Sequence, residues 1–309
     1  PEVVCSLDSS MVCDESGCPE PTEVGGNISG TWTLENSPYL VTQDILLQPS
    51  DTLIIEPGVQ VYMSDNLRFD IYGLLTAEGT ESDSIRFTQY NDYWLSINFA
   101  DAADDNSVLS YCVIEGASNS GFQPYYGSVN TNSSHPTITH NYFRHIGHNE
   151  GRTSCNGINL ASSHAIVDSN RFEDIMGNGI YIDANSTPEI RGNTLTDING
   201  YGIYVDGADD VSITGNSITS RYSSGIYATN TENLTISDNV IEGNSNYGIR
   251  IDQYNDYTII SDNSISDNNS AGIYLYRDND YMEIAGNEIR ENNNYGIDVS
   301  SSTNRDIYI

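Results

Sequence analysis

Aspartates recur at matching places in a repeated segment of this sequence and could bind a divalent cation. They form two candidate Ca²⁺ pairs, Asp183 with Asp206 and Asp238 with Asp262. Carboxylate oxygens suit Ca²⁺, and stacked carboxylates repel each other unless a cation or a proton relieves the repulsion. Exposed turn carboxylates that simply stay hydrated are the simpler interpretation. The sequence requires no cofactor, and Ca²⁺ is the one that it suggests.

The histidines form a second candidate metal site, because all five lie between residues 135 and 164. His135 and His164 occupy matching places in adjacent repeats, whereas His145 and His148 flank a lengthened repeat. Imidazole nitrogens are good ligands for transition metals. No tight ligand motif joins these residues, so solvated loop histidines are the simpler interpretation.

A column of aromatic residues is the third feature with chemical potential. Tyr181, Tyr204, Tyr227 and Tyr274 recur at one place in the repeat, and Arg250 interrupts them. A flat row of rings could stack against sugars or pack laterally against another molecule. Exposed tyrosines also stabilise one another in strands. The sequence leaves these uses open, and it marks no residue as catalytic.

A repeat of 23 or 24 residues positions all of these side chains. Its marker asparagines are spaced 29, 23, 23, 23, 24 and 24 apart, and a Gly-Ile pair recurs with them. Within each repeat, apolar and polar residues alternate as they do in strands. Stacked amides can turn a corner and hydrogen-bond from coil to coil. The marker asparagines are Asn141, Asn170, Asn193, Asn216, Asn239, Asn263 and Asn287.

These patterns predict an all-β fold, a right-handed, single-stranded parallel β-helix (β-solenoid) of about 10–11 coils. The coils are expected to be irregular over residues 31–133 and regular over 134–309, with residues 1–30 as an N-terminal cap or linker. Apolar residues three before and two after each marker asparagine should fill the interior. Cys112 shares such a position, which predicts a buried thiol rather than a reactive one.

The charge balance excludes several classes of function. Asp and Glu number 44 against 11 Lys and Arg, there is no Lys, and the formal net charge is −33. So acidic a surface repels nucleic acids and anionic membranes. No apolar run approaches the roughly 18 residues of a membrane-spanning helix, and no signal segment opens the chain. We expect a mature secreted protein, extracellular or at the cell surface.

Cysteines and glycosylation motifs agree with export. Cys5, Cys13 and Cys18 crowd the N-terminus as disulfide candidates, with a zinc site as the alternative. Five cysteines are an odd number, so at least one thiol stays free or pairs with another molecule. The candidate glycosylation sites are the Asn-x-Ser/Thr residues Asn27, Asn132, Asn185, Asn233 and Asn268.

The repeats resemble those of the pectin-lyase-like superfamily. The segments TWTLENSPYLVTQDILLQPSDTLIIEPGVQVYM and LSYCVIEG resemble the opening coils of secreted bacterial and archaeal surface β-helix proteins. The resemblance covers residues 31–309 and implies the fold, but the superfamily includes lyases, hydrolases, tailspikes and adhesins. Its lyases resemble one another in a Ca²⁺-binding acidic face with a Lys or Arg base. Here Lys is absent and Arg171 and Arg191 occupy different columns, which argues against a lyase.

The predicted function is therefore a non-catalytic extracellular structural or adhesive module. After Val299 the chain begins a new strand and stops, which would leave unpaired strand edges for another copy. Self-association, head to tail or lateral, could build a filament or surface layer, and cell-surface glycans are the other expected partners. The alternative is a polysaccharide-binding or polysaccharide-degrading enzyme, either a lyase or a glycoside hydrolase. Acid and base aspartates on adjacent coils would suit a hydrolase, and the sequence leaves that arrangement open.

Overall fold

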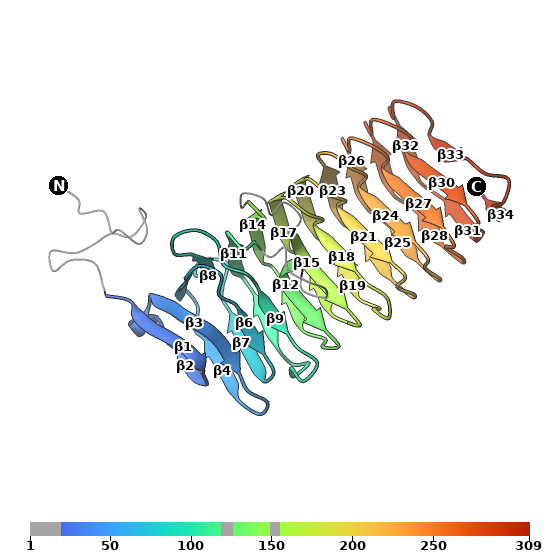
Figure 1. Cartoon of the computed structure of the whole chain (residues 1–309). Coiled ribbons are helices and arrows are strands. Elements are labelled where there is room, and N and C mark those ends of the chain that lie inside the picture. Colours follow the sequence, from blue (N-terminus) through green and yellow to red (C-terminus); the bar gives the residue numbers. More distant parts are fainter. Residues whose placement is uncertain (1–19, 119–125, 149–154) are drawn as a thin grey trace, which may run out of the picture.

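The computed structural model describes residues 20–118, 126–148 and 155–309. Short strands follow one another in coils along a single axis, so the chain is an all-β parallel solenoid (Figure 1). The one helical element among the described residues is a short 3-10 turn, η1 (Leu34–Asn36). The predicted fold class is confirmed.

Each coil contributes three strands, which we name A, B and C in chain order. The A strands form a 12-stranded sheet. They are β2 (Gly30–Trp32), β4 (Thr52–Ile55), β7 (Leu74–Glu78), β10 (Val108–Ser110), β13 (Thr137–Thr139), β16 (Ile166–Asp168), β19 (Glu189–Arg191), β22 (Ser212–Thr214), β25 (Thr235–Ser237), β28 (Ile259–Ser261), β31 (Asp280–Ala285) and β34 (Arg305–Tyr308).

The B strands follow the A strands around the coil. They are β5 (Gln60–Met63), β8 (Ile85–Gln89), β11 (Cys112–Glu115), β14 (Tyr142–Ile146), β17 (Arg171–Ile175), β20 (Thr194–Ile198), β23 (Ser217–Ser220), β26 (Val240–Glu242), β29 (Ser264–Ser266) and β32 (Glu288–Arg290).

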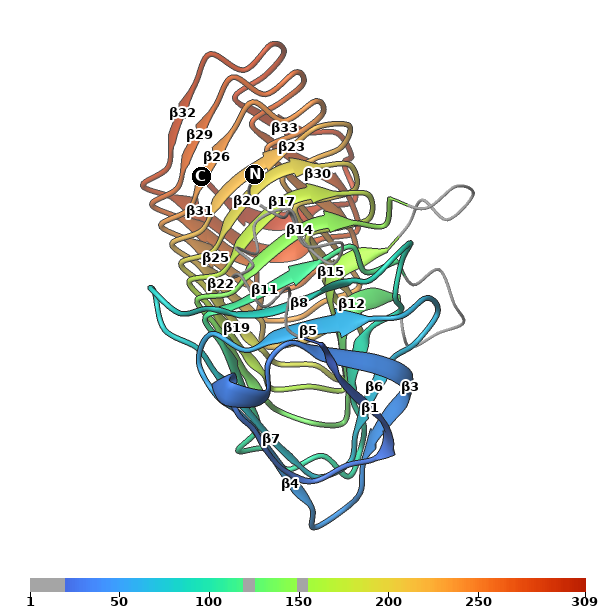
Figure 2. The same cartoon turned by 90° about the vertical axis from the view of Figure 1, so that its left-hand side faces the viewer.

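The C strands complete the coil, and A, B and C strands lie on different sides of the solenoid (Figure 2). They are β6 (Phe69–Ile71), β9 (Ile97–Phe99), β12 (Gly127–Asn132), β15 (Asn156–Ala161), β18 (Ile180–Ile182), β21 (Ile203–Asp206), β24 (Ile226–Thr229), β27 (Ile249–Gln253), β30 (Ile273–Arg277) and β33 (Ile297–Val299). The long β3 (Tyr39–Leu47) pairs with both β5 and β6 and so joins the B and C strands into one 22-stranded sheet.

The parallel ladders place equivalent residues directly over one another. Ile190 pairs with Ile213, and Ile213 with Ile236, and all three side chains are fully buried. Some interior columns hold aromatic rings, as in Phe143 and Phe172, whose ring planes are nearly parallel and whose centroids are 4.6 Å apart. Removing such columns of apolar surface from water is the main force that holds the solenoid together.

The marker asparagines form a hydrogen-bonded ladder at the corner between the A and B strands. Asn216 is 1% exposed, and its amide nitrogen donates to Oδ1 of Asn239 and to the carbonyl of Ile190, both at 3.0 Å. Its Oδ1 accepts the backbone N–H of Asn193 at 2.9 Å. The side chain therefore pairs backbone groups that the turn would otherwise leave buried without partners.

Two further asparagine ladders were not predicted. Asn244 and Asn268 follow the B strands, and the amide nitrogen of Asn268 donates to Oδ1 of Asn292 at 2.8 Å. Asn255 pairs with Asn279 between the C and A strands in the same way. The proposed glycosylation of Asn268 is thus wrong, because its side chain is 1% exposed and carries ladder hydrogen bonds.

The other glycosylation candidates stay predictions. Asn27, Asn185 and Asn233 are exposed, whereas Asn132 is half-buried.

The first coil begins earlier than the sequence suggested. β1 (Thr22–Asn27) lies within the segment expected to be a cap, yet it pairs in parallel with β3.

Cys5, Cys13 and Cys18 lie outside the described residues. Cys112 and Cys155 are buried free thiols, and burial raises the pKa of Cys112 far above its usual range, as expected for an unreactive cysteine. No helix in the described ranges is long and apolar enough to cross a membrane.

Replacing Asn216 with alanine should lower the free energy of unfolding by about 2–3 kcal/mol, because it leaves buried backbone groups unpaired. The midpoint of urea unfolding, followed by circular dichroism, measures the effect. Asn269→Ala is the matched control: Asn269 is exposed, and its substitution should cost less than about 0.5 kcal/mol. Equal midpoints for the two variants would contradict the stabilising role of the ladder.

Candidate functional site

The tyrosine column lies on the outward side of the C strands. Tyr181, Tyr204 and Tyr227 stack in register, and the centroids of neighbouring rings are 5.1 Å and 4.9 Å apart in edge-to-face geometry. Arg250 pairs with Tyr227 on one side and with Tyr274 on the other. Edge-to-face contacts of this kind hold each ring in a fixed orientation.

Two tyrosines that the sequence analysis did not include broaden this column into a surface. Tyr201 and Tyr247 lie in turns between B and C strands, and their rings stack on those of Tyr227 and Tyr274 at 4.6 Å and 4.4 Å. The guanidinium of Arg250 lies 5.2 Å from the Tyr227 ring. The tyrosine face is defined as Tyr181, Tyr201, Tyr204, Tyr227, Tyr247, Arg250 and Tyr274.

Carboxylates accept hydrogen bonds from the phenols of this face. Tyr181 and Tyr204 both donate to Oδ2 of Asp206, at 3.2 Å and 3.4 Å, and Tyr227 donates to Oδ2 of Asp252 at 3.0 Å. Burial, together with these nearby carboxylates, raises the pKa of all three phenols well above the ordinary value. The face therefore presents neutral rings beside carboxylate acceptors, a combination that suits sugar rings and hydroxyl groups.

One of the predicted Ca²⁺ pairs, Asp183 with Asp206, has hydrogen-bond partners among its neighbours. Asp183 accepts the backbone N–H of Ala184 at 2.7 Å, while Asp206 accepts the two phenols. Asp238 and Asp262 follow the paired residues Ser237 and Ser261 at the A–B corner, both in left-handed backbone. Calcium binding by these four residues remains a prediction.

A charged cluster lies on the outward side of β14 and β17. The phenol of Tyr142 hydrogen-bonds to Glu173, and the guanidinium carbon of Arg171 lies 4.8 Å from the Tyr142 ring. Arg171 also contacts Glu173 at 2.6 Å. Burial and the Glu173 hydrogen bond raise the pKa of Tyr142, and the Tyr142 hydrogen bond lowers the pKa of Glu173. The pair therefore combines a protonated phenol with an ionised carboxylate.

Arginines from neighbouring coils extend the charged cluster. Glu115 on β11 receives Arg86 at 3.2 Å from one side and Arg144 at 2.9 Å from the other. The Nε of Arg144 is buried and has no hydrogen-bond partner in the described ranges. We define the charged cluster as Arg86, Glu115, Tyr142, Arg144, Arg171 and Glu173. The sequence analysis missed it because it compared columns, whereas Arg171 and Glu173 are neighbours along one face of one strand.

Four of the five histidines form two groups, and the fifth, His140, stacks on Tyr111. His145 and His148 meet at Asp174: Nδ1 of His145 is 2.6 Å from Oδ2, and Nε2 of His148 is 2.9 Å from Oδ1. His135 and His164 lie together in turns between C and A strands, with ring centroids 4.6 Å apart. All four histidines were predicted as candidates from the sequence, but Asp174 was not. Its spacing of 29 residues from His145 is a signal that could have found it, because Asn141 and Asn170 have the same spacing.

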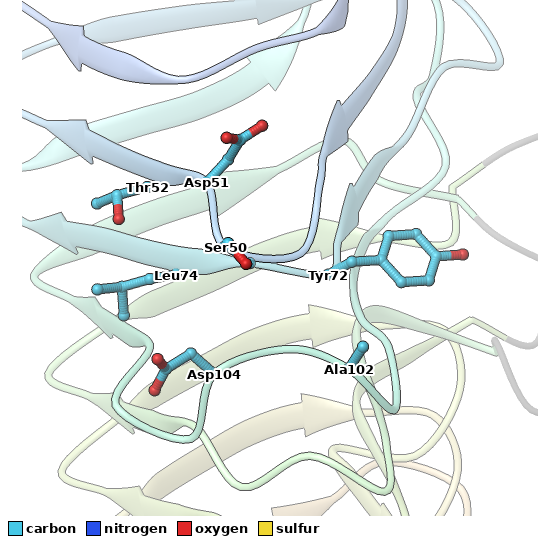
Figure 3. Close-up of a pocket in the computed structure, with 8 residues that line it drawn as sticks. Ser50, Asp51, Thr52, Tyr72, Leu74, Ala102 and Asp104 are labelled. Atoms are coloured by element: carbon cyan, nitrogen blue, oxygen red, sulfur yellow. The ribbon is translucent and has the colours of Figure 1, made fainter.

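Two surface hollows lie near polar residues. One, of about 290 Å³, is lined by Asp51, Asp104 and Tyr72, among others; Tyr72 points away from the two carboxylates (Figure 3). Hydrogen bonds from Asn106 lower the pKa of Asp104. The other hollow, of about 90 Å³, lies against His145 and His148.

The chain is a right-handed parallel β-helix repeat protein. A family model described as "Right handed beta helix region" matches residues 156–309. No curated protein matches the sequence. A structure of the periplasmic alginate epimerase AlgG is similar at a TM-score of 0.67 and 13% identity, covering 92% of this chain and 84% of that one. The A-module of the Azotobacter vinelandii mannuronan C-5 epimerase AlgE4 is similar at a TM-score of 0.53 and 16% identity, covering 92% and 90%.

These similarities correct the predicted function. A non-catalytic structural or adhesive module was expected, but the two solved structures described above, which share this fold over most of the chain, are named as polysaccharide epimerases. That prediction is wrong, and the alternative, a protein that acts on polysaccharides, has the better support. The absent Lys and the different columns of Arg171 and Arg191 were expected to disfavour a lyase, but Arg171 and Arg144 form their acidic contacts without sharing a column.

The half-buried phenols of Tyr181, Tyr204 and Tyr227 should resist ionisation at alkaline pH. Because the folded-state pKa values of Tyr181, Tyr204 and Tyr227 are raised, this stabilisation is complete below the ordinary tyrosine pKa of about 10 and is lost as the pH rises through the folded values. Tyrosinate absorbance recorded with circular dichroism should show a late step coupled to unfolding. Replacing all three with phenylalanine should remove three tyrosines from that step, and an unchanged late step would contradict the assignment.

Proposed function

We propose that this chain is a polysaccharide-acting enzyme that holds its glycan along the tyrosine face. The observation that carries the proposal is the set of ordered rings on successive C strands with carboxylate acceptors beside them. Successive coils are about 4.8 Å apart, so a long chain lying along the axis would meet several rings at once. The fold shared with polysaccharide epimerases supports the same interpretation.

Of the surface features described above, the charged cluster has the side chains best suited to catalysis. General acid–base catalysis needs a protonated group that can donate and an unprotonated group that can accept, and Tyr142 and Glu173 meet that description. Arg144 and Arg171 add fixed positive charge that could stabilise a developing anion. We assign Tyr142 and Glu173 as the proton-transfer pair.

The charged cluster lies on B strands and the tyrosine face on C strands, and the turns between B and C strands connect the two. His148, beside the charged cluster, lies in the turn that follows β14, and Tyr201 lies in the equivalent turn after β20, two coils further on. A rise of about 4.8 Å per coil separates them by about 10 Å along the axis. A sugar chain of a few residues would span that distance.

The net charge limits the kind of glycan. At −33 the protein repels a polyanion, and on the tyrosine face the only cation, Arg250, is already paired with Asp252 at 2.6 Å. We therefore expect neutral, hydroxyl-rich glycans to bind better than uronans at low salt. Uronan binding should strengthen as salt is raised, because salt screens the repulsion.

An exported location fits this proposal. AlgG, which shares the fold, is named as periplasmic. We infer that this chain also acts outside the cytoplasm, and fractionation of the source cells would test that location.

Replacing Tyr204 with alanine should weaken glycan binding about tenfold, because it removes the central ring and frees Asp206 from one phenol. Isothermal titration against neutral and uronic oligosaccharides at two salt concentrations measures the effect. Tyr257→Ala is the control, since Tyr257 is exposed in a turn between C and A strands. Equal affinities for the two variants would exclude the tyrosine face as the binding surface.

Incubation with a panel of polysaccharides should yield a product. Unsaturated ends indicate a lyase, new reducing ends without unsaturation indicate a hydrolase, and inverted residues without new ends, seen by NMR, indicate an epimerase. Tyr142→Phe and Glu173→Gln should each lower the rate about 100-fold or more while retaining glycan affinity. Full activity in both variants would show that other residues carry out the catalysis. If no glycan in the panel yields a product, the proposal that this chain is an enzyme fails.

A further inference from the structure

The His145–His148–Asp174 group is the strongest feature that the proposed function leaves unused. In the described ranges it is the one group of three or more His, Cys, Asp and Glu residues whose ligand atoms converge, all within 4.8 Å of one another. The three side chains are 57%, 42% and 31% exposed, so they can adjust without disturbing the core.

The coil stacking sets this geometry. Arg144 pairs with Glu173 and Ile146 with Ile175, so His145 lies directly over Asp174. Both residues have left-handed backbone, with φ of 52° and 59°, at matching positions in adjacent strands. His148 follows three residues later, in the turn after β14, and approaches the second carboxylate oxygen of Asp174.

A second observation points to a ligand at this place. The hollow of about 90 Å³ beside the two histidines is also lined by Asp92 and Ser118. Ser118 is 1% exposed, and its Oγ has no hydrogen-bond partner within the described part of the chain. A buried hydroxyl without a partner is costly, and water or another oxygen ligand held in the hollow would satisfy it.

We propose that His145, His148 and Asp174 bind a divalent transition-metal ion of the Zn²⁺ class, with an open coordination position facing the hollow. Two imidazoles and one carboxylate are a ligand set that leaves room for water or substrate. Ligand atoms around such an ion are about 3.4 Å apart, given bonds of about 2.1 Å. The observed contacts of 2.6 Å and 2.9 Å would therefore open by less than about 1 Å.

The donor chemistry distinguishes this site from the predicted Ca²⁺ pairs. Ca²⁺ takes six to eight oxygen ligands, whereas two of the three donors here are imidazole nitrogens. The site does not depend on the proposed glycan chemistry. Its position beside Tyr142 and Glu173, on the same two strands, would place an oxygen bound to the ion near the proton-transfer pair.

Titration of the full chain with Co²⁺ tests the site, because Co²⁺ reports its ligands in the visible spectrum. We expect one equivalent to bind, with d–d bands and no near-ultraviolet thiolate band, and Zn²⁺ to displace it. Ca²⁺ and Mg²⁺ should not compete at similar concentrations. A thiolate band that disappears on replacing Cys5, Cys13 and Cys18 with serine would assign the metal to the N-terminus and overturn the proposal.

Substitutions identify the ligands. Asp174→Asn keeps the shape and the left-handed backbone preference, and it should weaken Co²⁺ binding at least 100-fold. His148→Ala should have a similar effect. His164→Ala, in the separate histidine pair, should leave binding unchanged. The proposal fails if the wild-type chain binds no Co²⁺ at micromolar concentrations, if Asp174→Asn binds as wild type, or if His164→Ala loses the metal equally. Circular dichroism checks that each variant remains folded.

Discussion

The parallel hydrogen-bond ladder between coils is the constraint from which the other features of this protein follow. It fixes the rise per coil at about 4.8 Å, so the nearest neighbours of a side chain are its own equivalents in the coils on either side. A polar side chain inside must therefore pair with copies of itself. Asparagine can do so because its amide both donates and accepts, which explains why Asn193, Asn216 and Asn239 are buried yet fully hydrogen-bonded.

The same constraint acts on the outside of the solenoid. Tyrosines stacked on successive C strands shield one another from water and become a rigid surface. Acidic residues cannot stack so easily, because like charges repel at this spacing. Asp206 avoids the conflict by accepting phenols, and Asp252 by pairing with Arg250. The charged cluster and the histidines lie instead in the coils where equivalent residues are 29 positions apart and where successive coils differ in sequence.

Electrostatics operates on two length scales in this molecule. At long range the net charge of −33 dominates, and no Lys offsets it. At short range almost every arginine in the described ranges contacts a carboxylate, as Arg191 does with Asp168 at 3.0 Å. Arginines paired in this way interact with the groups in contact with them and do not attract distant anions, because salt screens interactions beyond about 10 Å. Recognition of a ligand must then depend on contact with particular faces.

The sequence by itself determined the features that recur from coil to coil. Strand periodicity, the asparagine ladder and the tyrosine column could all be predicted, because a side chain that stacks on its equivalents leaves its spacing in the sequence. The tertiary structure alone decided which unlike residues meet: Asp174 with His145 and His148, Tyr142 with Glu173, and Asp206 with two phenols. Tyr142 and Glu173 occupy non-equivalent positions, as do Tyr181 and Asp206, so their contacts leave no period to detect. Asp174 is the equivalent of His145 in the next coil, but His148 approaches it from a turn, and that approach leaves no period either.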